Sequence, residues 1–385
     1  MQCSYFDAHR CSSCTLMGTP YPQQVSNKDA LSRQLLVDAL GSGIDGEWER
    51  PYTGPEAGFR NKAKMVVGGT SKKPTLGILD ADGHGIDLRR CGVVDPAIAE
   101  VLPLIATFIR VNRIQPYHVP TRRGELKHVI VTANPDGQLM IRFVVRSQQG
   151  VDQVRGGLPG LLERLPQALI VTANLLPNHI AALEGEREVH LHGPATLPMR
   201  VNDVTLRLRP QGFFQTNTDV AAALYAQAQE WIAEVAPASV WDLYCGVGGF
   251  ALHAAAPGRV VTGIEISEGA IEGAGAARER AIADGVAGAS DVHFAVGDAG
   301  AWAMSQDHAA DLVLVNPPRR GIGADLAGWL ERCDAEHVIY SSCNATTLAK
   351  DLAAMPSWNL KRVRVMDMFP QTDHFEVITL LSRRR

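Results

Sequence analysis

The chain has 385 residues, of which 46% are hydrophobic and 20% are charged, and its formal net charge is −4. This length allows two domains with sizeable cores. The negative net charge excludes a polycation that binds nucleic acid non-specifically, but it is compatible with a local basic groove. The chain starts with polar residues and has no apolar run of ~18–20 residues, so we expect a cytoplasmic protein with no membrane partner.

Seven cysteines, an odd number, are placed unevenly along the chain. Three of them lie in the last third of the sequence, and the other four offer thiolates from one region: Cys3, Cys11, Cys14 and Cys91. In a reducing cytoplasm such a set indicates metal binding or catalysis rather than disulfides. Four cysteines suit either a [4Fe–4S] cluster or a structural zinc ion, and their spacing does not distinguish the two.

The first part of the chain, up to about residue 208, contains short mixed elements. Helices are predicted over 27–40 and 96–109, the second with Asp95 as N-cap ahead of Pro96. Strand-like runs occupy 64–67, 75–79, 127–132, 139–145 and 169–172, and the turn 134–137 joins two of them. This pattern predicts an α+β domain over residues 1–208.

The remainder of the chain alternates strands and helices regularly. Apolar strands are predicted over 239–243, 259–264, 292–296, 312–315 and 337–341, with helices over 219–235, 268–283 and 324–333 and one from Gly249. This alternation predicts a Rossmann-like parallel sheet covered on both faces, over residues 209–385. Ligands bind beyond the carboxyl ends of the strands in such sheets.

A glycine-rich turn follows the first of these strands and indicates a nucleotide-like ligand. Glu265 and Asp298 end the next two strands, where they could accept hydrogen bonds from ribose hydroxyls and an adenine amino group. The turn alone would also serve a dinucleotide or be a plain tight turn. Its third glycine comes too early for G-x-G-x-x-G, and Asn316-Pro317-Pro318-Arg319 ends the fourth strand, so S-adenosylmethionine is favoured. Methyltransferases that act on amino groups have an aromatic residue where Arg319 stands, so that chemistry is disfavoured.

Cys343 ends the next strand, within Ser341-Ser342-Cys343-Asn344. A lone cysteine is more often a small buried hydrophobe, but this one should face the same cleft as Asn316. Carbon 5 of uracil is a poor nucleophile that becomes reactive when a thiolate adds to carbon 6. A base must then remove the C5 proton before the thiol can leave.

Glu376 is the candidate for this base. It starts an apolar strand over 377–381, where burial would raise the pKa of its carboxyl group. A solvated carboxylate at the end of a strand fits the local sequence equally well. Asp373 and His374 are rivals for the same role.

Five motifs occur in order along the chain: Phe213-Phe214-Gln215-Thr216-Asn217, Asp242-Leu243-Tyr244-Cys245-Gly246-Val247-Gly248, Asn316-Pro317-Pro318-Arg319, Ser341-Ser342-Cys343-Asn344 and His374-Phe375-Glu376. Together they make the chain resemble the RNA 5-methyluridine methyltransferase family along essentially its whole length. The resemblance implies that Cys343 is the nucleophile and Glu376 the proton acceptor. It also implies an S-adenosylmethionine site lined by Gln215, Tyr244, Glu265, Asp298 and Asn316. The family usually has Asp in place of Asn316, which can still form a hydrogen bond but brings no charge.

The same resemblance bears on the cysteines and on the RNA. Ribosomal members of the family hold an iron–sulfur cluster with N-terminal cysteines, which implies a structural [4Fe–4S] cluster on Cys3, Cys11, Cys14 and Cys91. The stretch 60–65, Asn316 and Cys343-Asn344 are most similar to members that methylate 23S ribosomal RNA. The basic stretches 58–64 and 121–128 could contact RNA phosphates or be solvated faces, and we expect a monomer that modifies a loop or single-stranded uridine.

Three other functions remain open at this point. One is the same reaction on a tRNA uridine, against which the cysteine set argues. Another is a non-catalytic RNA-binding or iron–sulfur protein, which would have no reason to keep both Cys343 and Glu376. The last is an NAD-dependent oxidoreductase.

Overall fold

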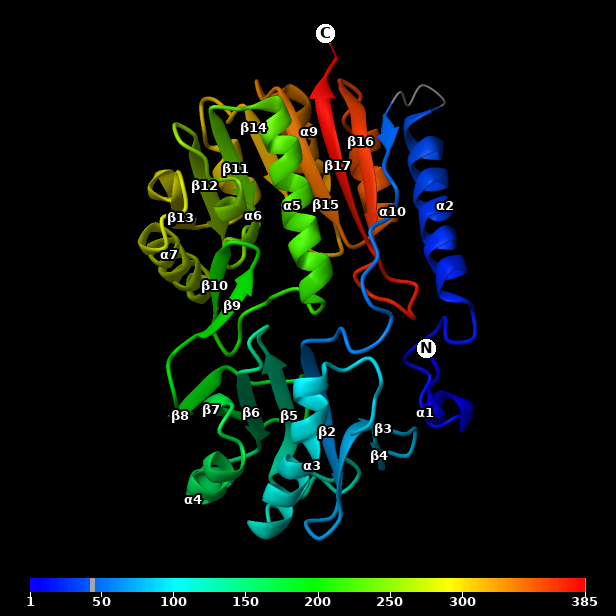
Figure 1. Ribbon diagram of the computed structural model, residues 1–385, viewed down its shortest axis with the longest axis vertical. Helices are drawn as coiled ribbons and strands as arrows, with labels where there is room; N and C mark the ends of the chain where they lie inside the picture. Colours follow the sequence, from blue (N-terminus) through cyan, green and yellow to red (C-terminus); the bar gives the residue numbers. More distant parts are fainter. Residues whose placement is uncertain (42–45, 385) are drawn as a thin grey trace. The chain divides into compact units, whose positions relative to one another are not determined.

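The computed structural model describes residues 1–41 and 46–384 (Figure 1). Their contacts divide the chain into two compact units. Unit 1 comprises Met1–Cys14 and Ala57–Leu197, and unit 2 comprises Thr15–Glu56 and Pro198–Arg385.

Unit 1 is built on a seven-stranded sheet with the strand order β4-β3-β2-β5-β6-β7-β8. All neighbouring strands are antiparallel except β6 and β7, which are parallel and are joined by the crossover helix α4 (Gln148–Arg164). The strands are β2 (Lys62–Gly69), β3 (Pro74–Leu79), β4 (Gly85–Asp87), β5 (Leu126–Ala133), β6 (Leu139–Val145), β7 (Ala168–Leu175) and β8 (Arg187–His192). The short helix α1 (Ser4–Asp7) lies near the amino terminus.

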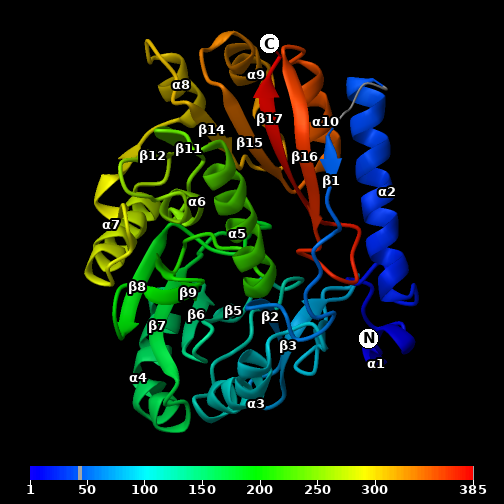
Figure 2. The same ribbon diagram turned by 45° about the horizontal axis from the view of Figure 1, so that its top comes forward.

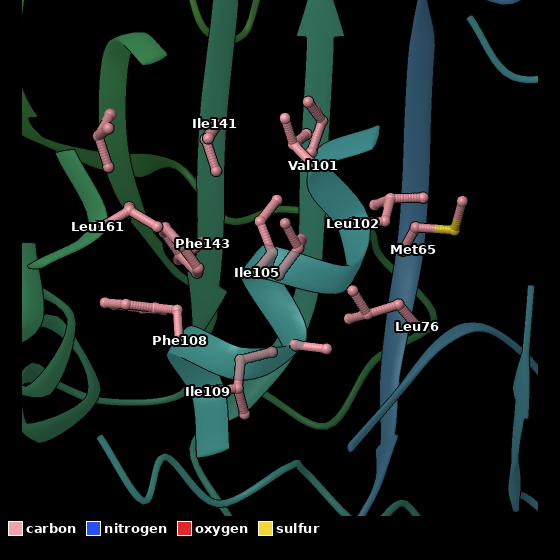
Figure 3. Packing of buried hydrophobic residues seen from close by; sticks show 14 of the residues in the cluster. Met65, Leu76, Val101, Leu102, Ile105, Phe108, Ile109, Ile141, Phe143 and Leu161 are labelled. Carbon is pink, nitrogen blue, oxygen red and sulfur yellow. The ribbon is translucent and has the colours of Figure 1, made fainter. Parts of the chain in front are cut away.

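Helix α3 (Pro96–Val111) supplies much of the core of unit 1. Its capping residue is Asp95, whose side chain accepts a hydrogen bond from Ala97 N at 2.8 Å, as the sequence predicts. Figure 3 shows Leu102, Ile105 and Phe108 of this helix packed among residues of the strands, including Phe143 of β6. This burial of apolar side chains gives unit 1 its own hydrophobic core.

Unit 2 contains an eight-stranded sheet with the order β1-β16-β17-β15-β14-β11-β12-β13. The five predicted parallel strands are confirmed, and β17 runs antiparallel between β15 and β16. The strands are β1 (Glu47–Trp48), β11 (Ser239–Leu243), β12 (Val260–Glu265), β13 (Val292–Val296), β14 (Leu312–Val315), β15 (His337–Ser342), β16 (Trp358–Met366) and β17 (Glu376–Arg383). A separate hairpin pairs β9 (Leu197–Val201) with β10 (Val204–Leu208).

Helices cover both faces of the sheet of unit 2, as expected for an alternating β/α chain (Figure 1). One face is covered by α2 (Tyr21–Leu40), α8 (Ala299–Met304), α9 (Gly323–Arg332) and α10 (Ala345–Ala353), which share a core with the strands. Helix α5 (Thr218–Val235) lies on the opposite face, next to α6 (Gly249–His253). Helix α7 (Glu268–Ala283) packs against β10, β12 and β13 and is followed by the 3-10 turn η1 (Ala289–Asp291).

The two units differ from the predicted single boundary at residue 208. Helix α2 belongs to unit 2, because it packs on α10 and β16 and buries Leu36 completely in the core there. Local sequence gives no sign of this contact, which joins segments more than 300 residues apart. Among the described residues we find no helix with the length and apolar character that a bilayer span requires.

Candidate active site

The candidate site of unit 2 lies along one edge of its sheet. Strand β11 lies between β12 and β14, so the chain winds in opposite directions on its two sides, and ligands bind at such a switch point. Five predicted site residues lie at or just after the carboxyl ends of parallel strands and therefore share this edge: Tyr244, Glu265, Asp298, Asn316 and Cys343.

Glu376 reaches the same edge from an antiparallel strand. It is the first residue of β17, and the next residue, Val377, lies opposite Ser342 of β15. The amino-terminal end of β17 therefore meets the carboxyl-terminal end of β15, beside Cys343. Gln215 is not on a strand; it is buried in the segment that leads into α5.

The glycine-rich turn between β11 and α6 has a backbone that requires glycine. Gly248 has a φ of +81°, and a Cβ there would lie 2.6 Å from the ring of Phe294. Gly246 N donates a hydrogen bond to Glu265 Oε2 at 3.2 Å, which ties the turn to the end of β12. Tyr244 also has a positive φ, +67°, so the chain turns sharply where the strand ends.

Asp298 and Asn316 border the turn on its two sides. Asp298 is exposed and caps α8, with Oδ1 accepting from Ala301 N at 2.8 Å. Asn316 N donates to Leu243 O at 3.3 Å, which holds the start of the Pro317-Pro318 segment against β11. The Asp298 carboxylate and the backbone of Asn316 are therefore both held at this edge of the sheet.

Asp242, within β11, is a feature that the sequence reasoning did not assign. Burial raises the pKa of its carboxyl group to about 8, with the charge of Glu265 acting in the same direction and a backbone hydrogen bond acting against them. That hydrogen bond, from Ala251 N to Oδ2 at 2.9 Å, fixes α6 above the strand. A carboxylate in an otherwise apolar strand was the signal that could have singled it out.

Cys343 lies at the start of α10. Asn344 caps that helix, with Oδ1 accepting from Thr346 N at 3.1 Å, and the amino-terminal end of a helix favours a thiolate. Burial and the Glu376 carboxylate raise the pKa of the Cys343 thiol, and the Arg319 guanidinium, which hydrogen-bonds to it, acts in the opposite direction. The thiol is thus half-buried, with the Arg319 guanidinium and the Glu376 carboxylate as its charged neighbours.

Arg319 is a second residue that the sequence reasoning missed. Its carbonyl accepts hydrogen bonds from Asn344 Nδ2 at 3.2 Å and Thr347 Oγ1 at 3.3 Å, so the segment after Pro317-Pro318 is tied to the start of α10. In the sequence analysis, Arg319 served only as an argument against amino-group chemistry. Its place in the same motif as Asn316 was the available signal.

Glu376 is buried, with 1% of its surface exposed. Burial raises the pKa of its carboxyl group to about 7, against the hydrogen bond that Ser341 Oγ donates to Oε1 at 2.9 Å. Its Oε2 is also buried and accepts no hydrogen bond within the described part of the chain. Asp373 and His374 are exposed, so Glu376 is the carboxylate best suited to take a proton in a dry site.

Three cysteines near the amino terminus, Cys3, Cys11 and Cys14, lie together with Cys91 in unit 1. Burial raises the pKa of the Cys14 thiol to about 11, and the charges of Cys91, Cys11 and Cys3 contribute to that increase, so the four sulfurs are neighbours. All four are free and partly buried. The structure therefore brings the four predicted ligands together.

The spacing of these sulfurs differs from that of a tight ligand set. No three of the four thiol sulfurs, all of which the structure describes, lie within 4.8 Å of one another. In the described ranges, the side chains that meet this criterion are those of Asp80, Asp82 and His84. The Asp80 set is exposed, and Asp80 Oδ1 accepts from the backbone of Asp82 and His84, as in an ordinary turn. Four thiolates around one zinc ion would lie roughly 4 Å apart.

The basic residues of unit 1 divide into two groups. Lys127 is buried: its Nζ donates to Asn178 O at 2.6 Å and lies 4.6 Å from the centre of the Tyr117 ring. Burial and the neighbouring Lys64 and Arg142 lower the pKa of Lys62 to about 8. Within the two predicted basic stretches, 58–64 and 121–128, the basic residues that remain exposed are Arg60, Lys64, Arg122 and Arg123.

Comparison with known proteins agrees with this geometry. The family described as tRNA (Uracil-5-)-methyltransferase matches residues 193–384. Proteins named 23S rRNA (uracil(747)-C(5))-methyltransferase RlmC from Yersinia pestis and Vibrio cholerae are each 44% identical to this chain, and one from Yersinia pseudotuberculosis is 45% identical. Each alignment covers 100% of both proteins.

A solved structure supports the fold. The Pyrococcus abyssi tRNA (uracil-54, C5)-methyltransferase, determined with S-adenosyl-L-homocysteine, superposes with a TM-score of 0.76 over 96% of this chain and 85% of its own, at 24% sequence identity. The relatives named above match over their full length, and the family match covers the strands that carry Cys343 and Glu376. The chain therefore belongs to the RNA uracil-5-methyltransferase family.

Proposed function

We propose that this protein methylates C5 of a uridine in 23S ribosomal RNA, with S-adenosylmethionine as the methyl donor. The observation that carries the proposal is the pairing of Cys343 with a buried Glu376, whose pKa is raised to about 7, at the switch-point edge of the sheet. The relatives of equal length are named for uracil 747, and we propose that the equivalent uridine is modified here.

The reaction begins with Cys343. Its thiolate forms a bond to C6 of the uracil, and the electron pair of the C5–C6 double bond becomes an enolate shared by C5 and the C4 carbonyl oxygen, which makes C5 nucleophilic. Arg319 and the start of α10 favour the thiolate that this step requires. S-adenosylmethionine, when bound, supplies the methyl group that C5 takes up and leaves as S-adenosylhomocysteine.

Glu376 completes the reaction. Its carboxylate removes the C5 proton, the electrons of that bond restore the C5–C6 double bond, and the bond from C6 to sulfur breaks to release Cys343. The hydrogen bond from Ser341 to Oε1 holds the carboxylate and leaves Oε2 to accept the proton. A pKa near 7 suits a general base at neutral pH.

The methyl donor would bind along the glycine-rich turn. Glu265 and Asp298 offer carboxylates at the ends of β12 and β13 for the ribose and the adenine amino group. Tyr244, Asn316 and the buried Gln215 would line the part of the donor nearest the uracil. Asn316 carries no charge, and its side-chain amide could donate a hydrogen bond to S-adenosylmethionine or to the uracil.

We further propose a structural [4Fe–4S] cluster on Cys3, Cys11, Cys14 and Cys91. The four thiols are neighbours, and their spacing is wider than a single zinc ion requires, which suits a larger inorganic core. These residues would bind the cluster and thereby fix the first residues of the chain against the loop that carries Cys91. Thiolate ligation of this kind requires a reducing compartment, so we place the protein in the cytoplasm.

Unit 1 would bind the RNA as part of a monomeric enzyme. Arg60, Lys64, Arg122 and Arg123 remain exposed and are available for phosphates, whereas Lys127 is held in the fold. The target uridine must leave its stack to reach Cys343, so a loop is an easier substrate than a duplex.

Transfer of a labelled methyl group tests the proposed function. Unmodified large-subunit rRNA and unmodified bulk tRNA would be supplied separately, and the labelled nucleoside mapped by nuclease digestion and mass spectrometry. We expect label in 5-methyluridine of the rRNA alone. Label only in tRNA would show that tRNA, and not rRNA, is the substrate. No label in either RNA would reject the proposed activity.

A further inference from the structure

The loop 367–375 joins β16 to β17 and ends at Glu376. Met366 and Glu376 are paired across the two strands, so the carboxylate stands directly at the end of this loop. Gln371, in the loop, has a φ of +68°, a conformation that residues other than glycine rarely adopt. Such a backbone persists only where surrounding contacts impose it.

Helix α2 provides those contacts on one side. Gln24 is fully buried and exchanges two hydrogen bonds with Gln371: Gln24 Nε2 donates to Gln371 Oε1, and Gln371 N donates to Gln24 Oε1, both at 3.0 Å. Gln24 Nε2 also lies 2.8 Å from Thr19 O. Figure 2 shows the loop beside the amino-terminal end of α2.

Lys28, one turn further along α2, holds the beginning of the loop. Its Nζ lies 2.7 Å from Asp367 Oδ1 and 3.2 Å from Phe369 O, and the side chains of Lys28 and Asp367 are 3% and 0% exposed. A buried ion pair contributes little net stability but disfavours other arrangements of its partners. Burial and the nearby Asp367 carboxylate raise the pKa of the hydroxyl of Tyr21, in the first turn of α2, so the two groups are neighbours.

Three more contacts fix the loop within unit 2. Asn217, which caps α5, donates from Nδ2 to Met368 O at 3.4 Å. Thr15 Oγ1 donates to Asp373 Oδ2 at 2.8 Å, and the backbone of the next residue donates to Gln371 O. The loop is therefore bonded at its start, middle and end.

The buried face of α2 has an apolar part, which packs on the sheet, and a polar part, which binds the loop 367–375. Its four buried residues are spaced by four: Gln24, Lys28, Ser32 and Leu36. Leu36 packs in the apolar core together with the partly buried Leu35, Ala39 and Leu40, and these side chains seat the carboxyl-terminal part of α2 on the sheet. Polar side chains at Gln24 and Lys28 are unnecessary for that packing, and both bind the loop that ends at the base.

We propose that Gln24 and Lys28 are positioning residues, which hold the loop 367–375 so that the Glu376 carboxylate meets the C5 proton. This inference rests on the proposed function. The last step should be the most sensitive to this positioning, because Cys343 and the ends of the parallel strands are held by other contacts. Loss of the positioning should therefore slow release of the methylated RNA more than formation of its covalent bond to Cys343.

Gln24→Met tests this inference, because methionine keeps nearly the same volume and helix propensity. It removes both hydrogen bonds to Gln371, together with those that Gln24 Nε2 donates to Leu16 O and Thr19 O. Purified full-length protein would be mixed with unmodified rRNA and labelled S-adenosylmethionine, and the covalent RNA–protein complex followed over time on denaturing gels. We expect the complex to form at the wild-type rate and to decay about 10- to 100-fold more slowly, as for a small misplacement of a catalytic group. Once decay limits the rate, turnover should fall, and the KM for RNA should fall with it because the covalent complex accumulates.

Ser32→Ala is the matched control, since Ser32 is buried on the same face of α2 and its hydroxyl forms no hydrogen bond within the described residues. It should behave as the wild type does. Gln371→Gly accepts the positive φ and loses both side-chain hydrogen bonds, to Gln24 and to Glu56. It should show the Gln24→Met pattern in a weaker form and serves if Gln24→Met does not fold.

The outcomes separate the two claims. Decay at the wild-type rate in both variants, or equal slowing of formation and decay, would reject the positioning role and leave the proposed function standing. A wild-type protein that methylates neither rRNA nor tRNA would reject the proposed function and this inference with it.

Discussion

The protein holds two kinds of cysteine site, and the difference between them lies in the neighbours of the sulfur. The Cys14 thiol of unit 1 is surrounded by three further thiols, whose charges add to the effect of burial on its pKa. The Cys343 thiol of unit 2 is comparably buried, but it lies beside Arg319, Glu376 and the start of α10.

This comparison shows how the surroundings decide the chemistry of a thiol. Several thiolates in one place repel one another until a metal centre neutralises them, so the site of unit 1 suits ligation. A single thiolate with a cation, a helix terminus and a proton acceptor nearby suits covalent catalysis. Burial alone would have assigned both sites to the same class.

Replacing the nucleophile should have the largest effect. We expect Cys343→Ala to lower turnover by at least about 10⁴-fold, because the covalent route is lost, while S-adenosylmethionine still binds in calorimetry. Cys333→Ala, a partly buried thiol outside the site, is the control and should retain activity. Turnover near the wild-type rate in Cys343→Ala would contradict the covalent mechanism.

Removing the base should have the next largest effect. Glu376→Gln keeps the shape and the hydrogen bond from Ser341 but takes up no proton, so we expect turnover to fall by about 10²- to 10⁴-fold. Steady-state methyl transfer would measure this loss. Asp373→Asn and His374→Gln, at exposed positions on the same loop, should change the rate far less. If either of these variants lost more turnover than Glu376→Gln, the altered residue and not Glu376 would be the general base.

The raised pKa of Glu376 should also affect stability. Between pH 4.5 and about 7 the folded protein holds a proton that the unfolded chain has released, so this contribution to stability is complete below pH 4.5 and is lost as the pH rises through 7. The pKa difference corresponds to roughly 3 kcal/mol. Denaturant unfolding as a function of pH should show this decline in the wild type and not in Glu376→Gln. Parallel profiles would mean that the carboxylate is not perturbed.

Changing a thiol of unit 1 should have the smallest effect on the rate. We expect Cys14→Ser to lose iron and sulfide and to lower the thermal midpoint by several degrees, because ligation contributes to folding. The rate per folded molecule should hardly change, since no step of the reaction requires electrons. Iron content in the control Cys333→Ser should match the wild type. A wild type that purifies with one zinc ion in place of iron would contradict the cluster.

The sequence predicted the sheet of unit 2 well because local pattern determines it. Strands β11, β13 and β14 and helix α7 have the predicted bounds, since buried parallel strands are continuous apolar runs. The edge position of Cys343 followed from the same pattern. Strand β16 was missed, because charged residues alternate with its apolar ones.

What remained beyond prediction depends on contacts between distant segments. No local pattern encodes the place of α2 in unit 2. The same holds for the hydrogen bond between Gln24 and Gln371, which are 347 positions apart. The roles of Arg319 and Ser341 likewise became visible only when the ends of β14, β15 and β17 were brought together. The burial of Glu376 distinguished it from Asp373 and His374, which the sequence left as rivals.

The central claim is that Cys343 bonds to the uracil and Glu376 releases it. The most direct measurement is peptide mapping, by mass spectrometry, of the complex formed when Glu376→Gln is incubated with unmodified rRNA and S-adenosylmethionine. We predict a peptide whose Cys343 carries a methylated uridine nucleotide. A variant that forms no covalent complex, or one joined through another residue, would contradict this account.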